Sequence, residues 1–277
     1  MGRALEIISG LVTAPGGTLT PLTMAAGNSA TVRNANLASR IALLQTWATN
    51  QAEGIWRIRS PKLHDNVQGI RFRSPAGINL PQLTPGTWQR LFAQDNLTLE
   101  LSGSAVGGEI EQAALLLWYE DLPGAQSRLI SIPELLSRTV NSWTTEVPIT
   151  PGAGGNFSGQ VAINSAFDNF KANTDYALVG FEVDVLCHAV RFTSPDFANL
   201  GVGGPGNLNS RHLTTRWFFH LTEQLGIPLI PVFNSANKNG TLVDIAQNQA
   251  AAAVNVTAIL HELAPAGNLQ IAQPALA

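Results

Sequence analysis

Residues 70–86 read IRFRSPAGINLPQLTPG, and residues 190–206 read VRFTSPDFANLGVGGPG. Aligned without a gap, the two stretches share eight of 17 positions. The step from Arg-Phe to Ser-Pro is typical of a strand that ends in a turn. Proline cannot donate to a strand ladder, and it pushes the residue before it out of the helical region. The two stretches therefore indicate an internal repeat of a β unit.

Two further matches follow the same order along the chain. Residues 21–28 resemble residues 148–156, and residues 117–123 resemble residues 259–265. The spacing between matched positions differs from one match to the next, so insertions between them are required, and loops tolerate insertions. Matches at the start, middle and end of each half favour a duplication.

The duplication predicts two domains of ordinary size. The first spans residues 1–125 and includes an N-terminal arm, and the second spans residues 126–277 and includes a C-terminal arm. The boundary is expected where Pro123-Gly124 interrupts an apolar strand.

Composition excludes several classes of protein. Apolar residues make up 45% of the chain and charged residues 13%, against about 25% charged in an average soluble domain. The longest apolar runs fall well short of the roughly 20 residues of a membrane span. A net charge of −3 argues against a nucleic-acid grip, which needs clustered Lys and Arg. A surface this poor in charge indicates burial against other copies.

Strand signals dominate the chain. Short runs rich in branched and aromatic residues alternate with Gly, Pro, Asn and Ser clusters, which is typical of sandwiches and jelly rolls. These runs are Ile55–Ile58, Val67–Phe72, Leu97–Leu101, Ala113–Tyr119, Tyr176–Val185, Leu229–Phe233 and Val254–Leu260. Helices are predicted at Asn36–Trp47, Thr87–Ala93 and Arg211–Leu225.

The two ends of the chain are predicted to be arms. Glu6 interrupts the apolar start, so a short amphipathic arm is favoured over a signal peptide. The tail Ala264–Ala277 has two prolines, no charge and no clear period, which suits an extended arm held by another surface.

No group of residues forms a strong catalytic or metal motif. The histidines are His64, His188, His212, His220 and His261. His220 and Glu223 would share a helix face and suit a metal pair, but no third ligand accompanies them at a short spacing. Glu182 and Asp184 alternate with apolar residues and would share one strand face, where acid–base chemistry or an exposed polar face explains them. We expect no catalytic, cofactor-binding or metal-binding residues.

The single cysteine and the arginines favour structural roles. Cys187 lies at an inward-facing strand position, which predicts a buried small hydrophobe rather than a nucleophile. Arg57, Arg59, Arg71 and Arg73 form a local basic cluster. A strand face paired with the carboxylates of a neighbour explains this cluster, and contact with lipid head groups or a glycan is the alternative.

Two similar β units, each with a short helix between late strands, resemble the double jelly-roll major capsid proteins of the PRD1/PM2-like viruses, which are tailless, icosahedral and have an internal membrane. The resemblance covers nearly the whole chain at the level of architecture, without a diagnostic sequence motif. It implies an all-β chain of two tandem jelly rolls with a few short helices. It also implies a bacteriophage capsid protein located in the virion and assembled in the host cytoplasm.

The resemblance also implies partners. Three copies of two barrels give a pseudo-hexagonal homotrimer, which contacts neighbouring capsomers, other virion proteins at the vertices and, through the N-terminal arm, a membrane. Direct contact with nucleic acid is not expected, because residues 1–30 carry one basic residue, Arg3. The alternatives are a double jelly-roll enzyme or binding protein that acts on glycans, and a phage spike or decoration protein.

Overall fold

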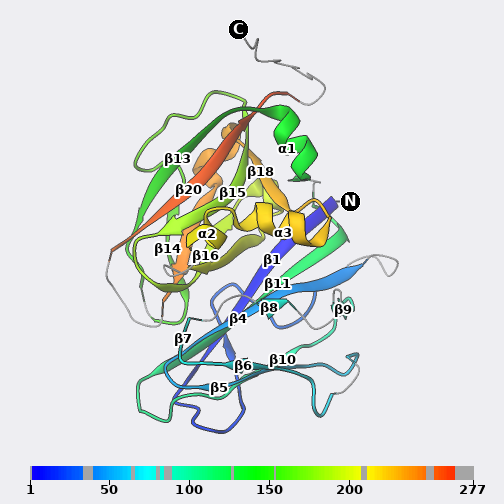
Figure 1. The fold of residues 1–277 in the computed structure, drawn as a ribbon, viewed down its shortest axis with the longest axis vertical. Helices are drawn as coiled ribbons and strands as arrows, with labels where there is room; N and C mark the ends of the chain where they lie inside the picture. The colour runs from blue at the N-terminus through cyan, green and yellow to red at the C-terminus, as the bar shows by residue number, and fades with distance from the viewer. Residues whose placement is uncertain are drawn as a thin grey trace.

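The computed structural model shows a chain built mainly from antiparallel strands (Figure 1). The residues that it describes are 2–33, 40–63, 66–78, 82–83, 89–125, 128–152, 154–206, 211–247 and 253–265.

The first part of the chain forms two sheets. The larger has the order β3-β1-β11-β4-β7, with β8 and β9 also paired to β4, and the smaller has the order β2-β10-β5-β6. The strands are β1 (Gly2–Thr13), β2 (Thr20–Pro21), β3 (Thr23–Met24), β4 (Ile41–Asn50), β5 (Gly54–Arg59), β6 (Ile70–Ser74), β7 (Gly77–Ile78), β8 (Gln82–Leu83), β9 (Gln89–Leu91), β10 (Thr98–Leu101) and β11 (Ile110–Leu122). We call this part the first unit.

The rest of the chain, which we call the second unit, forms two more sheets. Their orders are β12-β18-β15-β20-β13 and β14-β19-β16-β17. The strands are β12 (Leu129–Ile130), β13 (Thr139–Ile149), β14 (Phe157–Ala162), β15 (Asp175–Val183), β16 (Cys187–Thr193), β17 (Gly201–Gly206), β18 (Ile230–Asn234), β19 (Leu242–Ala246) and β20 (Val254–Leu263). The helical turns are α1 (Ile132–Arg138), η1 (Pro195–Phe197), α2 (Arg211–Thr214), α3 (Trp217–Leu225) and η3 (Ser235–Gly240).

The same strand order occurs in both units. The order β1-β11-β4 corresponds to β13-β20-β15, and β2-β10-β5-β6 corresponds to β14-β19-β16-β17. In each unit a first long strand pairs with the last one, β1 with β11 and β13 with β20. Within the described residues no strand of one unit pairs with a strand of the other. The chain is therefore all-β and jelly-roll-like.

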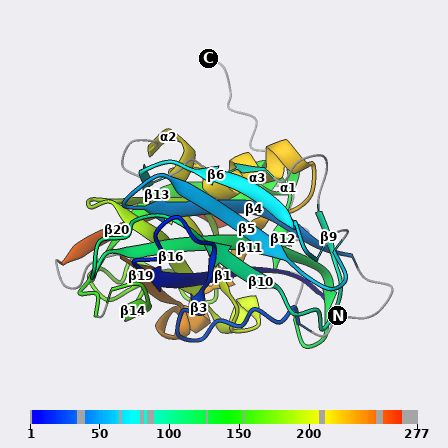
Figure 2. The same cartoon turned by 90° about the horizontal axis from the view of Figure 1, so that it is seen from below.

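The four sheets lie in layers along the long axis of the molecule (Figure 1). The β2-β10-β5-β6 sheet is at one end, followed by the β1-β11-β4 sheet, and Figure 2 shows the first of these from below. Strands β1 and β11 then pack on β17 and β16 of the second unit. The β13-β20-β15 sheet lies beyond β16 and β17. The β1-β11-β4 sheet is thus covered on both faces.

Burial on both faces explains why one predicted helix is wrong. In the range Asn36–Trp47, residues 41–47 belong to strand β4, and residues 36–39 lie outside the described residues. Every residue of β4 is buried, so the strand has no polar alternation. A β-bulge at Leu44 also breaks the period of two. An apolar run without alternation fits a helix as well as a strand in sequence.

The other sequence predictions have mixed outcomes. The predicted helix at Thr87–Ala93 is wrong, because Gln89–Leu91 form β9 and pair with the otherwise open edge of β4; residues 87–88 lie outside the described range. The helix at Arg211–Leu225 is confirmed as α2 and α3, and it ends at Gly226, whose φ of 67° suits glycine. The predicted strands all coincide with strands, although β6 begins only at Ile70 and β15 ends at Val183. In the described part of the chain no helix is long and apolar enough to cross a bilayer.

The predicted N-terminal arm is wrong. Gly2–Thr13 form strand β1, which pairs along most of its length with β11. Leu5 and Ile7 face the second unit and Ile8 faces the core of the first. Glu6, which interrupts the apolar pattern, is also buried, because Arg33 and Tyr119 bind its carboxylate. The C-terminal tail lies outside the described residues from Ala266 onward.

Similar strand orders recur in the two units, but the predicted sequence repeat at residues 70–86 and 190–206 is wrong. Arg71 and Phe72 lie on β6, at the edge of its sheet, whereas Arg191 and Phe192 lie on β16, whose counterpart is β5. The match between residues 21–28 and 148–156 also falls on different strands, because Pro21 is in β2 and Pro148 in β13. The last match joins corresponding strands, β11 and β20.

The structure gives the correct register for the middle of the repeat. Arg57-Ile-Arg-Ser60-Pro61 on β5 corresponds to Arg191-Phe-Thr-Ser194-Pro195 on β16. Each leading arginine faces a carboxylate on the neighbouring strand, Glu100 for Arg57 and Asp244 for Arg191. The first unit contains two similar motifs on neighbouring strands, RIRSP at residues 57–61 and RFRSP at residues 71–75. The sequence match pairs the second motif with β16, whereas the structure pairs the first.

Candidate functional site

The contact between the two units joins unlike faces. The outward face of the β1-β11-β4 sheet carries apolar side chains that belong to the same buried cluster as the second unit: Leu5, Ile7, Ala42, Leu44, Trp47, Ala114, Leu116 and Trp118. It packs on β16 and β17 of the opposite kind of sheet. At Gly201 a Cβ atom would lie 2.4 Å from Cδ of Arg191 and 3.4 Å from Ile7, so glycine allows this approach.

A buried histidine lies in this contact. His188 is 1% exposed, and its Nδ1 lies 2.8 Å from Thr49 Oγ1 of the first unit. Trp47 Nε1 donates to the backbone carbonyl of His188 at 3.0 Å. Burial lowers the pKa of His188 to about 3, although a backbone contact with Ala113 opposes the shift. The imidazole is therefore neutral at physiological pH and ties the two units together without carrying charge.

A cleft of about 670 Å³ opens where the units meet. Its polar lining includes Glu6, Arg33 and Asn199. Arg33 Nε donates to Glu6 Oε1 at 2.8 Å, and the Tyr119 hydroxyl donates to Glu6 Oε2 at 2.8 Å. Burial, together with the charge of Glu6, raises the pKa of Tyr119. Glu6 is the only carboxylate among the described residues that line the cleft, whereas glycoside hydrolysis needs two.

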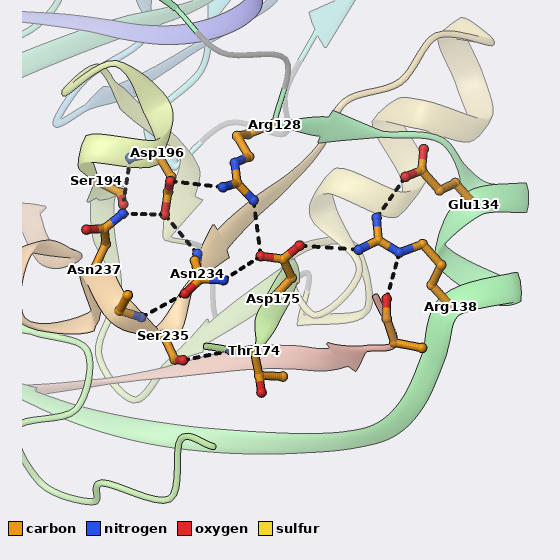
Figure 3. Close-up of polar contacts among 12 residues, drawn as sticks. Arg128, Glu134, Arg138, Thr174, Asp175, Ser194, Asp196, Asn234, Ser235 and Asn237 are labelled. Carbon is orange, nitrogen blue, oxygen red and sulfur yellow. Dashed lines mark hydrogen bonds and ion pairs between the residues drawn. The ribbon is translucent and has the colours of Figure 1, made fainter. Parts of the chain in front are cut away.

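Two carboxylates of the second unit, Asp175 and Asp196, lie close together (Figure 3). Arg128 binds Asp175 at 3.1 Å and Asp196 at 3.6 Å, and Arg138 binds Asp175 at 3.3 Å. Asn234 donates from its side chain to Asp175 and from its backbone to Asp196. Each carboxylate is thus held by cations and amides, so this network joins α1, β15, η1 and β18 rather than presenting a free base.

The arginine cluster lies on the outward face of the β2-β10-β5-β6 sheet. Arg57 Nε and Arg59 NH2 bind the buried carboxylate of Glu100 at 2.5 and 2.8 Å. Burial opposes ionisation of Glu100, but hydrogen bonds from Arg59 and Arg57 lower its pKa. Arg71 and Arg73 on β6 are exposed, and Arg73 pairs with exposed Glu53 at 3.1 Å. A neighbouring strand thus supplies the carboxylate that pairs with half of the cluster.

The remaining candidate residues are dispersed. Cys187 is buried as predicted, and burial raises its pKa to about 12. His220 Nδ1 lies 3.5 Å from Glu223, whereas His212 is exposed. The described residues include no group of three potential metal ligands. His64 lies outside them, and half-buried His261 binds Thr139.

The expected shared face of Glu182 and Asp184 is not formed. Strand β15 ends at Val183, and β16 begins at Cys187 in a different sheet, so residues 184–186 form a connection rather than one long strand. Asp184 accepts hydrogen bonds from the backbone and side chain of Asn255. Buried His188 lies on β16 and faces the first unit.

Sequence reasoning missed the residues that join the units. Trp47 was assigned to a helix and Leu5 and Ile7 to an arm, so their common outward face was not recognised. The available signal was the uninterrupted apolar run of residues 113–119, together with the mainly apolar residues 41–48, where only Gln45 and Thr46 are polar. Such sequences are typical of strands buried on both faces.

Comparisons with known proteins give weak similarities only. No protein-family model and no curated protein matches the chain. The PBSX exported protein XepA is 13% identical, with 90% of this chain and 88% of that one covered and a TM-score of 0.20. The major capsid protein P2 from bacteriophage PM2 is 8% identical, with 96% and 99% covered and a TM-score of 0.22. The Macrobrachium rosenbergii nodavirus structure is 10% identical, with 94% and 97% covered and a TM-score of 0.25. TM-scores this low indicate a weak viral capsid-like resemblance and carry no argument about function.

Proposed function

We propose that the chain is a viral structural protein: a major capsid protein, of a bacteriophage of the PRD1/PM2-like kind, that assembles as pseudo-hexagonal homotrimers into an icosahedral shell over an internal membrane. Its two units are two tandem jelly rolls, divided near residue 125. The protein works by burial of its flanks between copies and has no catalytic site.

The contact between unlike sheet faces is the observation that supports this proposal most. If two like units were joined through the same surface patch, that patch would be buried on both units and could not bind a further copy. Here the β1-β11-β4 sheet of one unit instead contacts the β16-β17 side of the other. One outward face of each kind remains, so the same arrangement can continue from copy to copy and close into a ring.

The mass of the purified protein in solution tests the proposed trimer. Three chains of 29.4 kDa give about 88 kDa, and light scattering should find this species or a multiple of it. A stable 29.4 kDa monomer at micromolar concentration, with no larger assembly in the source particle, would contradict the proposal.

The proposed shell does not grip the genome directly. Glu100 binds Arg57 and Arg59 of β5, and Glu53 binds Arg73 of β6. These two carboxylates offset part of the arginine cluster and leave few positive charges for phosphate, whose neutralisation supplies most non-specific affinity. Fluorescence anisotropy with a labelled DNA duplex at about 150 mM salt should show no binding at micromolar protein. Binding that weakens steeply with added salt would contradict this part of the proposal.

The alternative of a glycan-active enzyme has less support. The cleft between the units offers the single carboxylate of Glu6, already bound by Arg33 and Tyr119. Asp175 and Asp196 are likewise held by Arg128. A spike or decoration protein remains the second alternative. Electron microscopy of the source particle separates it from a shell protein, since it would stay a small oligomer rather than form the shell.

A further inference from the structure

Two outward sheet faces remain at least partly exposed when the units of one chain have packed together. The first is the outward face of β5 and β6, with Arg57, Arg59, Arg71 and Arg73, which we call the arginine face. The second is the outward face of the β13-β20-β15 sheet. Residues of β20 alternate between buried and half-buried, and those of β13 between buried and exposed along its second half, so the β13 and β20 part of this face is open to solvent. Helices α2 and α3 pack against β15, where Gly180 lies against the backbone of Thr214 and Thr215.

The second face carries two carboxylates in one row. Glu146 on β13 and Glu182 on β15 both pair with Thr257 on the strand between them. Adjacent strands lie about 4.8 Å apart, so the two glutamates are separated by roughly 10 Å. Within the described residues, the side-chain carboxylate of neither glutamate makes a hydrogen bond or an ion pair with another residue. We call this row of Glu146, Thr257 and Glu182 the glutamate face.

The two faces are complementary in charge. The arginine face has four cations, against which Glu100 and Glu53 supply two negative charges. The glutamate face has two negative charges and no cation among its named residues. Val67, whose side chain is 74% exposed, belongs to the turn over the arginine face and accepts a hydrogen bond from Arg57. An exposed apolar residue thus lies beside the charges.

The two faces also belong to non-equivalent sheets of their units, as do the two faces that meet inside the chain. Inside the chain, a β1-β11-β4 face packs on a β16-β17 face. Their counterparts in the other unit are the β13-β20-β15 sheet, which carries the glutamate face, and β5-β6, which carries the arginine face. A contact between copies through these two faces repeats the internal arrangement.

We propose that the arginine face of one copy docks on the glutamate face of a second copy of this chain, head to tail. The inference rests on the proposed self-assembly and names the surfaces that carry it. Opposite charges specify the partner face and speed the encounter, while the reverse pairing of like faces is repelled. The inner contact, being apolar and buried, holds the two units of one chain together; the outer contact, being charged, forms after folding.

A charge-swap series tests this docking. Arg71→Glu with Arg73→Glu reverses the arginine face, and Glu146→Arg with Glu182→Arg reverses the glutamate face. Arg57 and Arg59 stay in place because they hold Glu100. Each reversed face should weaken association roughly a hundredfold or more, since like charges brought together cost several kcal/mol. The variant that carries all four substitutions should assemble again, because both faces have exchanged sign.

The controls keep the outcomes separate. Arg40→Glu with Glu223→Lys reverses two exposed charges that lie on neither face and should assemble like the unmodified chain. Circular dichroism and thermal unfolding of every variant show whether the fold is kept. Sedimentation velocity then gives the mass of each at the concentration where the unmodified chain is assembled.

Restored assembly in the four-substitution variant supports the docking. If the unmodified chain assembles and the folded single-face variants assemble equally well, the docking is wrong and the proposed function stands. If the unmodified chain is itself a monomer, both fail. Salt gives a second check: raising NaCl from about 0.1 M to about 1 M shortens the screening length from about 10 Å to about 3 Å and should dissociate the copies while each chain stays folded.

Discussion

The outward faces of the β1-β11-β4 and β13-β20-β15 sheets occupy the same place in two like units, yet one is apolar and the other polar. Leu116 on β11 is fully buried against the second unit, whereas Ile259 on β20 is half-buried, with Thr144 and Gly180 beside it in the ladder. The difference shows that strand order is set by the inner faces, which both units share. The outward faces are free to differ, and they decide what each unit packs against.

The smaller sheets of the two units differ in the same way, as their corresponding arginine–carboxylate pairs show. These pairs are Arg191–Asp244 and Arg57–Glu100. Arg191 binds Asp244 with two parallel hydrogen bonds, and both side chains are at most 10% exposed. The Arg191 guanidinium also lies 4.0 Å from the Phe157 ring centre. Arg57 shares Glu100 with Arg59 on a more open face. One pair is sealed by the neighbouring unit and the other is not.

Breaking the sealed pair should have the largest effect. Arg191→Ala leaves Asp244 buried without a cation, and we expect a loss of about 3–5 kcal/mol in the free energy of unfolding. Arg57→Ala leaves Glu100 with Arg59, and we expect a loss of about 1 kcal/mol. Urea denaturation of both variants measures the difference. Equal losses would mean that the inter-unit contact does not seal Arg191.

Shortening an apolar side chain on each of the two outward faces should have the next largest effect on stability. Leu116→Ala removes a fully buried side chain between the units and should cost about 3 kcal/mol. Ile259→Ala removes a half-buried one and should cost about 1 kcal/mol in the isolated chain. A cost for Ile259→Ala as large as that of Leu116→Ala, measured by the same denaturation, would show that the second face is covered within the chain.

Acid should weaken the contact between the units through His188. Its pKa is about 3 in the fold and about 6.5 when unfolded, so below pH 6.5 the unfolded chain binds a proton that the native chain does not. Stability therefore falls as the pH drops from 6.5 towards 3, by about 2 kcal/mol at pH 5. The His188→Gln variant should lose less stability between pH 7 and pH 5 than the unmodified chain.

Other histidines also contribute to the pH dependence of the unfolding free energy. Partial burial lowers the pKa of His261 as well, so a smaller decline remains in the variant. His212→Gln, at an exposed position, is the matched control and should leave the decline unchanged. Identical pH dependence in the His188→Gln variant and the unmodified chain would show that His188 is not held neutral between the units.

Substitutions in the turns that follow β5 and β16 should have the smallest effects on stability, and the effects in the two turns should be nearly equal. Ser60 Oγ accepts from the backbone of Lys62 and donates to Asp95, and Ser194 Oγ accepts from the backbone of Asp196 and bonds to Thr241. Asp95 lies just before β10, the strand next to β5 in its sheet. Thr241 lies just before β19, the strand next to β16 in its sheet. Ser60→Ala and Ser194→Ala should each cost about 1 kcal/mol. Thermal shifts that differ several-fold would argue against a common turn.

The sequence allowed prediction of the all-β class and of most strands, because turn chemistry and apolar runs are local signals. It did not allow the correct register, because Arg-x-x-Ser-Pro occurs twice in the first unit, at residues 57–61 and 71–75. The predicted helix at residues 41–47 and the predicted N-terminal arm are wrong for a different reason. A strand covered on one face by its own unit and on the other by a second unit shows no alternation, so only the packing partner reveals it.

The candidate surfaces were less predictable still. The arginine cluster was visible in sequence because its members alternate on two strands. Glu146 and Glu182 lie 36 positions apart and meet only through the pairing of β13 and β15 with β20. No local pattern connects them.

Electron cryo-microscopy of the assembled protein tests most directly whether the arrangement inside one chain is repeated between chains. We predict a ring of six similar β densities, in which sheets of unlike kind alternate and each contact between copies resembles the one between units. Contacts between copies through identical faces, or rings without a pseudo-sixfold outline, would contradict this arrangement.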